Sequence, residues 1–307
     1  MKSGVTKIPR QLVVRSGRLL GLVFYSVAIP HRRLVQRNIQ FCYPQWSHRE
    51  VVGLSRRVFM SFGITFVEML QSTFMSPEEV FKACRIEGEE RFINACKSNQ
   101  GIVIVSAHMG NWEVGLHFSS HYGKPMLGVA AKTRRGRTNI LLNRWRNRLS
   151  STIIDKKGAL PNITEGLRRG EVVGMLIDQS RRKHGVEVTF FGRKATASPA
   201  AALLALRCKS LVLPAFSVRE PDGQLTIQVK RPIEMTRTGD LRRDIQSNTQ
   251  RLIDVVEDVV RRYPDQWFWL LRPWKVHYPN LYSDWDAQRR RRKAAKKKKK
   301  NLSKKNR

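Results

Sequence analysis

The sequence predicts an α/β protein with a mixed, mostly parallel sheet flanked by helices. Short apolar segments alternate with helix-forming segments between residues 102 and 262, which is the pattern of strands connected by helices. The run Gly101-Ile-Val-Ile-Val105 is apolar throughout, as expected for a strand that helices cover on both faces. The chain has 307 residues, of which 41% are hydrophobic, so it can bury a large core.

Residues 1–36 are predicted to form a basic, amphipathic N-terminal segment that associates with a membrane. Its apolar run, residues 19–29, contains eleven residues, fewer than the roughly 20 that a membrane-crossing helix needs. Arg15 and Arg18 precede this run. We therefore expect a helix that lies on the membrane surface; a buried helix of a soluble domain is the alternative. No small-residue cleavage site follows a clean apolar core, so we expect no cleaved signal peptide.

Residues 37–287 are predicted to form one α/β domain. Its first helix covers residues 47–71, with Ser47 as N-cap and Glu50 completing a capping box. Apolar residues recur on one face of this helix: they are Val51, Leu54, Val58, Phe62, Phe66 and Leu70. A second helix is expected from Ser76-Pro77, because proline favours the first helical position.

The expected strands and helices then alternate. The helix from Leu160 stops at Gly170, a residue typical of a helix C-terminus, and the last helix ends before Pro264. The expected strands are 102–105, 126–130, 152–154, 172–177, 211–216 and 225–229, and the expected helices are 138–149, 160–169, 199–208 and 241–262.

The charge of the chain restricts its partners. It has 58 Lys and Arg against 24 Asp and Glu, a formal net charge of +34. Residues 288–307 contain thirteen of these cations and no acid, so we expect a disordered tail that buries no core of its own. The rest of the chain keeps +21 of the charge. Nucleic acid, anionic lipid and acidic proteins are the three classes of partner that such a surface attracts.

The four cysteines, Cys42, Cys84, Cys96 and Cys208, match no Cys-x2-Cys metal pattern. We expect free, mostly buried thiols in a reducing compartment. We also expect no metal and no cofactor.

The strongest candidate for chemistry is the segment Ser106-Ala-His-Met-Gly-Asn-Trp-Glu113, which follows the apolar strand at 102–105. His108 and Glu113 suit the removal of a proton from a hydroxyl group. The histidine takes the proton, and the glutamate fixes the ring tautomer and offsets the imidazolium charge. Such a pair also arises by chance, and a purely structural histidine is the alternative.

This segment resembles the His-x4-Asp/Glu motif of the bacterial lipid A biosynthesis acyltransferases, the lauroyl/myristoyl family. Five further blocks occur in the family's order, and the resemblance as a whole spans roughly residues 12–276. The other blocks are 18–22, 37–44, 168–179, 190–198 and 264–275. Six blocks in the right order are far more specific than any one of them.

The resemblance implies a glycerolipid acyltransferase-like fold and a membrane-associated O-acyltransferase on the cytoplasmic face of the bacterial inner membrane. It implies that a fatty acyl chain moves from the thioester of an acyl carrier protein to a hydroxyl of a lipid A precursor, an anionic glycolipid. The basic chain suits both substrates, because acyl carrier proteins are acidic and lipid A precursors carry phosphates. No Gly-x-Ser-x-Gly motif is present, so we expect direct transfer without an acyl-enzyme.

A basic loop is the first candidate for substrate binding. Lys132, Arg134 and Arg135 follow the expected strand 126–130, where a cation could hold a phosphate or the oxyanion. The family commonly has Arg-Pro where this chain has Lys132-Thr133, which weakens the transfer of that role. A solvated basic loop is the alternative.

Two further segments are candidates. Asp178 and Gln179 end the strand predicted at 172–177, and carboxylates at this edge of a sheet often line a site. Asp178 is expected to anchor a basic loop or bind the acceptor, with capping of a turn as the alternative. Arg193 and Thr196 precede a predicted helix N-terminus at Ser198, which suits a phosphate. The aromatic cluster Trp267, Trp269, Trp274 and Tyr278 suits either a membrane interface or the core.

Two other interpretations stay open. The same class of enzyme could act on a lysophospholipid or an aminolipid, because those families share the His-x4-Asp/Glu motif. A basic nucleic-acid-binding protein would explain the charge but not the ordered blocks. No helix-turn-helix, zinc or RNP-like signature supports it, so we expect no nucleic-acid partner.

Overall fold

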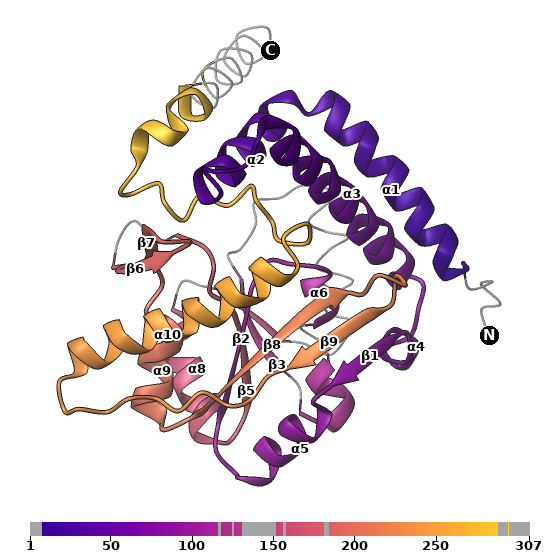
Figure 1. Cartoon of the computed structure of the whole chain (residues 1–307). Coiled ribbons are helices and arrows are strands. Elements are labelled where there is room, and N and C mark those ends of the chain that lie inside the picture. The colour runs from indigo at the N-terminus through magenta and orange to yellow at the C-terminus, as the bar shows by residue number, and fades with distance from the viewer. Residues whose placement is uncertain are drawn as a thin grey trace, which may run out of the picture.

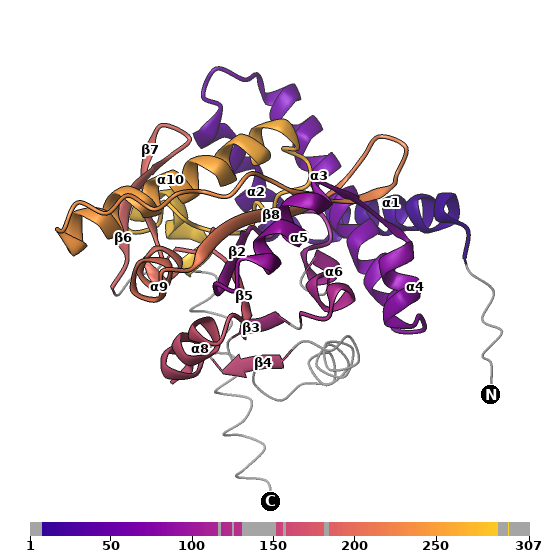
Figure 2. The same cartoon turned by 90° about the horizontal axis from the view of Figure 1, so that it is seen from below.

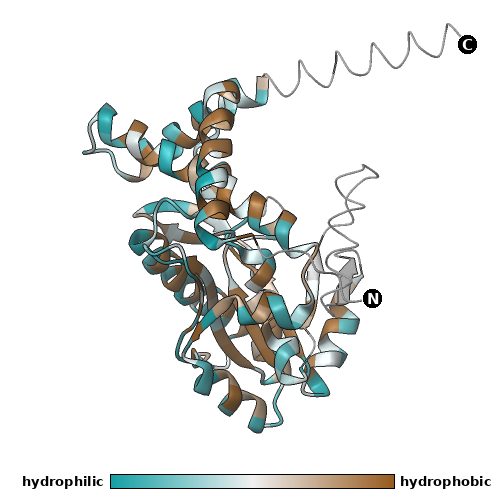
Figure 3. Ribbon diagram, turned by 90° about the vertical axis from the view of Figure 1, so that its right-hand side faces the viewer, coloured by the Kyte–Doolittle hydropathy of each residue, from teal (hydrophilic) through white to brown (hydrophobic). Residues whose placement is uncertain are grey.

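The computed structural model describes residues 8–115, 118–124, 126–130, 152–155, 158–180 and 184–287, together with residue 294. In this part of the chain a seven-stranded sheet occupies the centre, with helices on both faces and a layer of N-terminal helices beside it (Figure 1). The central strands are strongly hydrophobic (Figure 3), which agrees with their burial on both sides.

The strand order of the sheet is β1-β9-β8-β2-β5-β3-β4, so β2 is its central strand. All neighbouring pairs are parallel except β8 and β9, which are antiparallel. The predicted mixed, mostly parallel sheet flanked by helices is therefore confirmed. The strands are β1 (Cys84–Glu87), β2 (Ile102–Ser106), β3 (Met126–Ala130), β4 (Thr152–Asp155), β5 (Val172–Leu176), β8 (Leu211–Arg219) and β9 (Leu225–Val229).

Side chains of β2 alternate between two hydrophobic cores. Val103 and Val105 belong to the core that α8, α9 and α10 cover, whereas Ile102 and Ile104 belong to the core that α5 and η1 cover. Figure 2 shows α8 and α9 on one side of the strands and α6 on the other. These elements are α5 (Glu89–Lys97), α6 (Trp112–Gly115), η1 (Phe118–Tyr122), α8 (Ala159–Arg168), α9 (Ala200–Cys208) and α10 (Leu241–Arg262).

The N-terminal layer consists of α1 (Arg10–Val27), α2 (Ile29–Cys42) and α3 (His48–Ser72), and α4 (Pro77–Lys82) follows it. Ser47 and Glu50 form the predicted capping box at the start of α3. The backbones of α1 and α3 touch where they cross, because a Cβ added at Gly17, Gly21 or Gly63 would overlap the backbone of the opposite helix. The predicted boundary between residues 36 and 37 falls inside α2.

The apolar face predicted for α3 is buried in only one half. Val51, Leu54 and Val58 are buried, whereas Phe62, Phe66 and Leu70 are 38%, 47% and 47% exposed. Exposed apolar side chains of α1 are Leu12, Leu19, Leu22, Val23, Phe24 and Val27. We call these nine exposed residues the apolar face of α1 and α3.

No single helix in the described ranges has the length and apolar character to cross a bilayer. Helices α1 and α2 reach that length and composition only when taken as a pair, and a bend of 97° separates them.

Three strands were not predicted: β1, and the hairpin of β6 (Val186–Phe190) and β7 (Arg193–Ala197). The hairpin loop is Phe191-Gly192, with φ of 54° and 68°, as a type I′ turn requires. The stretch predicted to open a helix at Ser198 is therefore strand β7, and α9 begins at Ala200 with Pro199 as its N-cap. The predicted helix 138–149 and, apart from residue 294, the predicted tail lie outside the described residues.

The segment after α10 packs against α2. The Asn38 amide donates to the carbonyls of Trp269 (2.7 Å) and Leu271 (2.9 Å), and it accepts at Oδ1 from the Tyr282 hydroxyl (3.0 Å). Of the two interpretations of the aromatic cluster, core packing holds for the three tryptophans, which are at most 1% exposed: Trp267, Trp269 and Trp274.

Candidate active site

His108 and Asp178 meet because two neighbouring parallel strands end in register. Ser106, the last residue of β2, lies opposite Leu176, the last residue of β5. His108 and Asp178 each follow two residues later, at the carboxyl edge of the sheet, where sites of α/β proteins form. The His108 Nδ1 atom lies 2.7 Å from Asp178 Oδ1.

Asp178 is held by three donors. Its Oδ1 bonds the histidine ring, and its Oδ2 accepts from the backbone N–H of His108 (2.7 Å) and from Trp267 Nε1 (2.9 Å). The carboxylate has no exposed surface, whereas the His108 side chain is 14% exposed. On the open side of the ring, Gln179 Nε2 lies 3.2 Å from His108 Nε2. One nitrogen of the ring therefore faces the protein interior, and the other faces an exposed amide.

The electrostatics of the pair favour an ionised carboxylate. Burial alone would raise the pKa of Asp178, but the charge and hydrogen bonds of His108, followed by the bond from Trp267, hold it below its ordinary value. Burial alone would lower the pKa of His108. The charge and hydrogen bond of Asp178, and then the charge of Glu113, outweigh burial and raise this pKa above its ordinary value.

Glu113 lies in α6, where its side chain is buried. Its Oε1 accepts from the neighbouring Trp112 Nε1 at 3.2 Å. The sequence suggested Glu113 as the carboxylate that orients His108, whereas the carboxylate bonded to Nδ1 in the structure is that of Asp178. Glu113 influences His108 through its charge, and its predicted catalytic role stays a prediction.

The turn that carries His108 is tied to the segment after α10. Phe268 N donates to His108 O (2.8 Å) and Gly110 N donates to Gln266 O (3.0 Å), around an isolated antiparallel bridge between Met109 and Trp267. Gly110 has φ of 52°, and a side chain here would overlap the Ser217 carbonyl. Residues 264–269 thus fix the backbone of the turn that carries His108.

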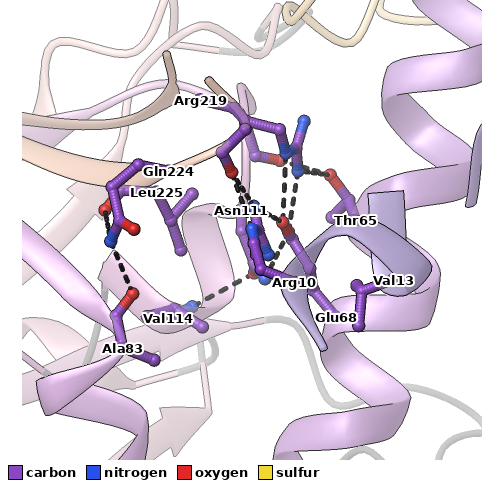
Figure 4. Close-up of polar contacts among 12 residues, drawn as sticks. Arg10, Val13, Thr65, Glu68, Ala83, Asn111, Val114, Arg219, Gln224 and Leu225 are labelled. Atoms are coloured by element: carbon purple, nitrogen blue, oxygen red, sulfur yellow. Dashed lines mark hydrogen bonds and ion pairs between the residues drawn. The ribbon is translucent and has the colours of Figure 1, made fainter. Parts of the chain in front are cut away.

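A buried ion pair holds the same turn from the side of α3 (Figure 4). Arg219, at the end of β8, donates to Glu68 through Nε (3.0 Å) and Nη2 (2.7 Å). Glu68 also accepts from Arg10 Nη2 of α1 (2.6 Å) and from Asn111 Nδ2 of the turn (3.1 Å). Thr65 donates to the Gly110 carbonyl (2.9 Å). Burial would raise the pKa of Glu68, but Arg219 and then Arg10 hold it below its ordinary value.

An apolar cleft opens beside the histidine. Trp112 and Phe268 have ring centroids 5.5 Å and 6.4 Å from that of His108, and Phe62 of α3 stacks on Phe268 at 5.2 Å. The cleft is also lined by Val35, Val58 and Phe59. Because Phe62 belongs to the apolar face of α1 and α3, the cleft and that face are continuous.

The family of the chain follows from its sequence. A family profile described as bacterial lipid A biosynthesis acyltransferase matches residues 2–276. The chain belongs to this family. It is 24% identical over 276 residues to a lipid A biosynthesis lauroyltransferase of Escherichia coli (strain K12), covering 89% of this chain and 88% of that one. It is 25% identical over 291 residues to a lipid A biosynthesis acyltransferase of Haemophilus influenzae, covering 90% and 89%.

Among solved structures, the 1-acyl-sn-glycerophosphate acyltransferase from Thermotoga maritima aligns with 81% of this chain and 98% of its own. The TM-score is 0.36 and the sequence identity 16%, too slight a likeness to carry an argument.

The other residues predicted for substrate binding in this member of the family are distributed differently. Gln179 is at the histidine, as described above. Thr196 and Asp178 both line a small cavity, and Thr196 Oγ1 lies 3.3 Å from His277 Nε2. The Arg193 guanidinium lies 5.1 Å from the centre of the Phe41 ring. Three predicted residues lie outside the described part of the chain: Lys132, Arg134 and Arg135.

The sequence missed several residues that build the site. The sequence suggested core packing or a membrane interface for Trp267, but not that it donates a hydrogen bond to Asp178. Its position in the family's C-terminal block was the one indication that it belongs to the site. Glu68 and Arg219 gave no signal, because their meeting depends on the fold. Within the described residues no cluster of three or more His, Cys, Asp or Glu side chains could hold a metal ion.

Proposed function

We propose that this protein is a membrane-associated O-acyltransferase that moves a fatty acyl chain from an acyl carrier protein thioester to a hydroxyl of a lipid A precursor. His108 is the general base, and Glu113 helps to stabilise its charged form. The observation that supports this most directly is the hydrogen-bonded His108 ring, with Nδ1 on a buried carboxylate and Nε2 on the open side. The family assignment supports a lipid acyltransferase.

The proposed reaction is a direct transfer. His108 Nε2 removes the proton of the acceptor hydroxyl as its oxygen attacks the thioester carbonyl. The tetrahedral intermediate collapses, the C–S bond breaks, and the leaving thiolate takes the proton from the imidazolium. The two nearby carboxylates, Asp178 and Glu113, stabilise the imidazolium between these steps, in agreement with the raised pKa of His108.

The cysteines argue against a covalent thioester intermediate on the protein. Burial raises the pKa of Cys84 to about 12 and raises the pKa of Cys42 well above its ordinary value. Thiols with such pKa values stay protonated near neutral pH, and the thiolate is the nucleophilic form.

The apolar cleft suits the acyl chain. Phe62 and Phe268 are stacked on each other, and Phe268 lies beside His108, so a fatty chain that packs along the outer surface of these rings brings its thioester carbonyl toward the histidine. Burying each methylene contributes about 0.8 kcal/mol, so a cleft that accepts several of them gives useful affinity for the chain.

The apolar face of α1 and α3 suits a lipid surface. Its exposed side chains include Leu19 (65%) and Val27 (69%), and water-soluble proteins seldom expose so many neighbouring large apolar residues. Arg15 and Arg18 are exposed on α1 beside them, and cations near an apolar face favour anionic lipid. We propose that this face lies in the cytoplasmic leaflet of the inner membrane, where the cleft receives lipid substrates.

Charge supports the identity of the two substrates. Acyl carrier proteins are acidic and lipid A precursors carry phosphates, and the net charge of +34 favours both. The proposed binding residues for these anionic groups are Lys132, Arg134, Arg135, Gln179, Arg193 and Thr196.

The test is acyl transfer by the purified protein in detergent, with acyl-loaded acyl carrier protein and a lipid A precursor, followed by mass spectrometry. We expect a product heavier by one acyl group. In a folded His108→Ala variant, we expect activity to fall by ~10²–10⁴-fold. If product forms only with a lysophospholipid or an aminolipid, the acceptor is that lipid and not a lipid A precursor. No transfer to any of these lipids, together with tight binding of RNA or DNA, would refute the proposed function.

A further inference from the structure

The two oxygens of Asp178 face different kinds of donor. Oδ2 accepts from two groups that always carry a hydrogen, the backbone N–H of His108 and the Trp267 indole N–H. Oδ1 faces His108 Nδ1, which carries a hydrogen in only one of the two neutral tautomers. The buried Asp178 carboxylate thus links the His108 backbone, the His108 ring and Trp267 of the C-terminal block.

We infer that Asp178, rather than Glu113, is the positioning residue that keeps the proton of neutral His108 on Nδ1 and leaves Nε2 free to act as the base. This inference rests on the proposed function, because it assigns a role in proton transfer by His108.

Both neighbours of the ring favour the same tautomer. An ionised Asp178 only accepts, so Nδ1 must donate to it. The amide nitrogen of Gln179 only donates, so Nε2 must accept from it. Gln179 is exposed, and its hydrogen occupies the place that the proton of an acceptor hydroxyl takes. Substrate binding therefore exchanges one donor for another at Nε2 without changing the tautomer.

The surroundings of Glu113 argue for a lesser role. Its Oε1 is engaged by Trp112, and it affects the pKa of His108 only through its charge, after both effects of Asp178. Among the described residues, the charged groups that act on His108 are Asp178 beyond β5 and Glu113 in α6. Its other named neighbours are neutral: Trp112, Gln179 and Phe268.

An Asp178→Asn substitution tests this geometry sharply. The amide oxygen must take the place of Oδ2, because two obligatory N–H donors point at that position. The amide NH₂ then faces Nδ1 and donates to it, which forces the ring proton onto Nε2. The same exchange in a Ser-His-Asp triad lowers kcat about 10⁴-fold with the geometry intact. We expect a loss of ~10²–10⁴-fold here, larger than for the matched Glu113→Gln variant.

The first measurement can be made on the parent protein, with His108→Ala used only to assign the signal. Nitrogen-15 NMR of histidine-labelled protein distinguishes the tautomers, and the His108 signal is identified by its absence in His108→Ala. Above the pKa of His108 we expect the proton on Nδ1 in the parent protein and on Nε2 in Asp178→Asn. A parent protein with the proton on Nε2 overturns the inference even if Asp178→Asn does not fold.

The second measurement is the pH profile of acyl transfer. Activity needs neutral His108, so it rises as pH increases through the pKa of this residue. Asp178→Asn removes the charge that most strongly raises the pKa of His108 against the effect of burial. The activity of this variant should therefore rise at lower pH than that of the parent, and its maximal activity should be lower. Glu113→Gln should move the rise less. A folded Asp178→Asn variant with parental turnover and profile overturns the inference, provided that His108→Ala is inactive; an active His108→Ala variant refutes the proposed function instead.

Discussion

Glu68→Gln should destabilise the protein and loosen the turn that carries His108. The substitution removes the charge that balances Arg219, whose side chain is 6% exposed, as is that of Glu68. Breaking a buried ion pair from one side costs about 3–5 kcal/mol, a large share of the 5–15 kcal/mol that typically stabilises a domain. At about 2–4 °C per kcal/mol for a protein of this size, the Tm should fall by roughly 6–20 °C.

The assay is thermal unfolding in mild detergent, followed by tryptophan fluorescence, with acyl transfer measured well below the Tm. The matched control is Asp258→Asn, which breaks an exposed pair with Arg262 at 3.3 Å and should change stability by at most about 1 kcal/mol. Adding Arg219→Met to Glu68→Gln should restore part of the lost stability, because no uncompensated guanidinium of Arg219 then stays buried. A Tm of Glu68→Gln equal to that of Asp258→Asn would refute this reasoning.

The pH dependence gives an independent check on Glu68. Folding lowers the pKa of Glu68, so the contribution of its carboxylate to stability is fully present above its unfolded pKa of ~4.3. That contribution is lost as the pH falls through the folded value. The Tm of the parent should therefore fall more steeply below pH ~4 than that of Glu68→Gln, and parallel curves would contradict the assignment.

Three further outcomes are expected. Leu70→Asp on the apolar face should weaken binding to anionic vesicles about tenfold or more, whereas Leu241→Asp, equally exposed at 47% on α10, should not; equal effects would exclude α3 from the membrane surface. Charge reversal of the three cations in 132–135 should raise the KM for the acceptor more than it lowers kcat, and an unchanged KM would favour a solvated loop. Deleting 288–307 should reduce vesicle binding at low salt, by up to about 1 kcal/mol per cation, with little change of activity in detergent; loss of that activity would assign the tail to catalysis.

The sequence predicts the ends of β2 and β5 but not their adjacency. His108 and Asp178 each stand just beyond an apolar strand, and that much follows from pattern alone. Their contact requires β5 to lie beside β2, although β3 and β4 come between them in the chain. Strand order depends on how helices pack over the whole sheet, so Glu113, the nearer carboxylate in sequence, was the natural choice.

Periodicity identified the apolar face of α3 but not what covers it. Phe66 and Leu70 continue the stripe of Leu54 and Val58, yet only the latter two are buried. Helical periodicity reports apolarity alone, so it cannot separate a side chain in the core from one on the surface. The hairpin of β6 and β7 is different, because alternating residues around Phe191-Gly192 did carry a signal for it.

The close crossing of α1 and α3 bears on how this enzyme can be made tractable in solution. Removing α1 is an obvious way to reduce its apolar surface, but α1 also covers the backbone around Gly63 and supplies Arg10 to Glu68. A chain without α1 would therefore expose the backbone of α3 that α1 now covers. It would also lose Arg10, one of the two arginines that pair with Glu68 beside Asn111. Polar replacement of single exposed positions, such as Leu19 and Val27, is the less disruptive route to a well-behaved sample for crystals or NMR.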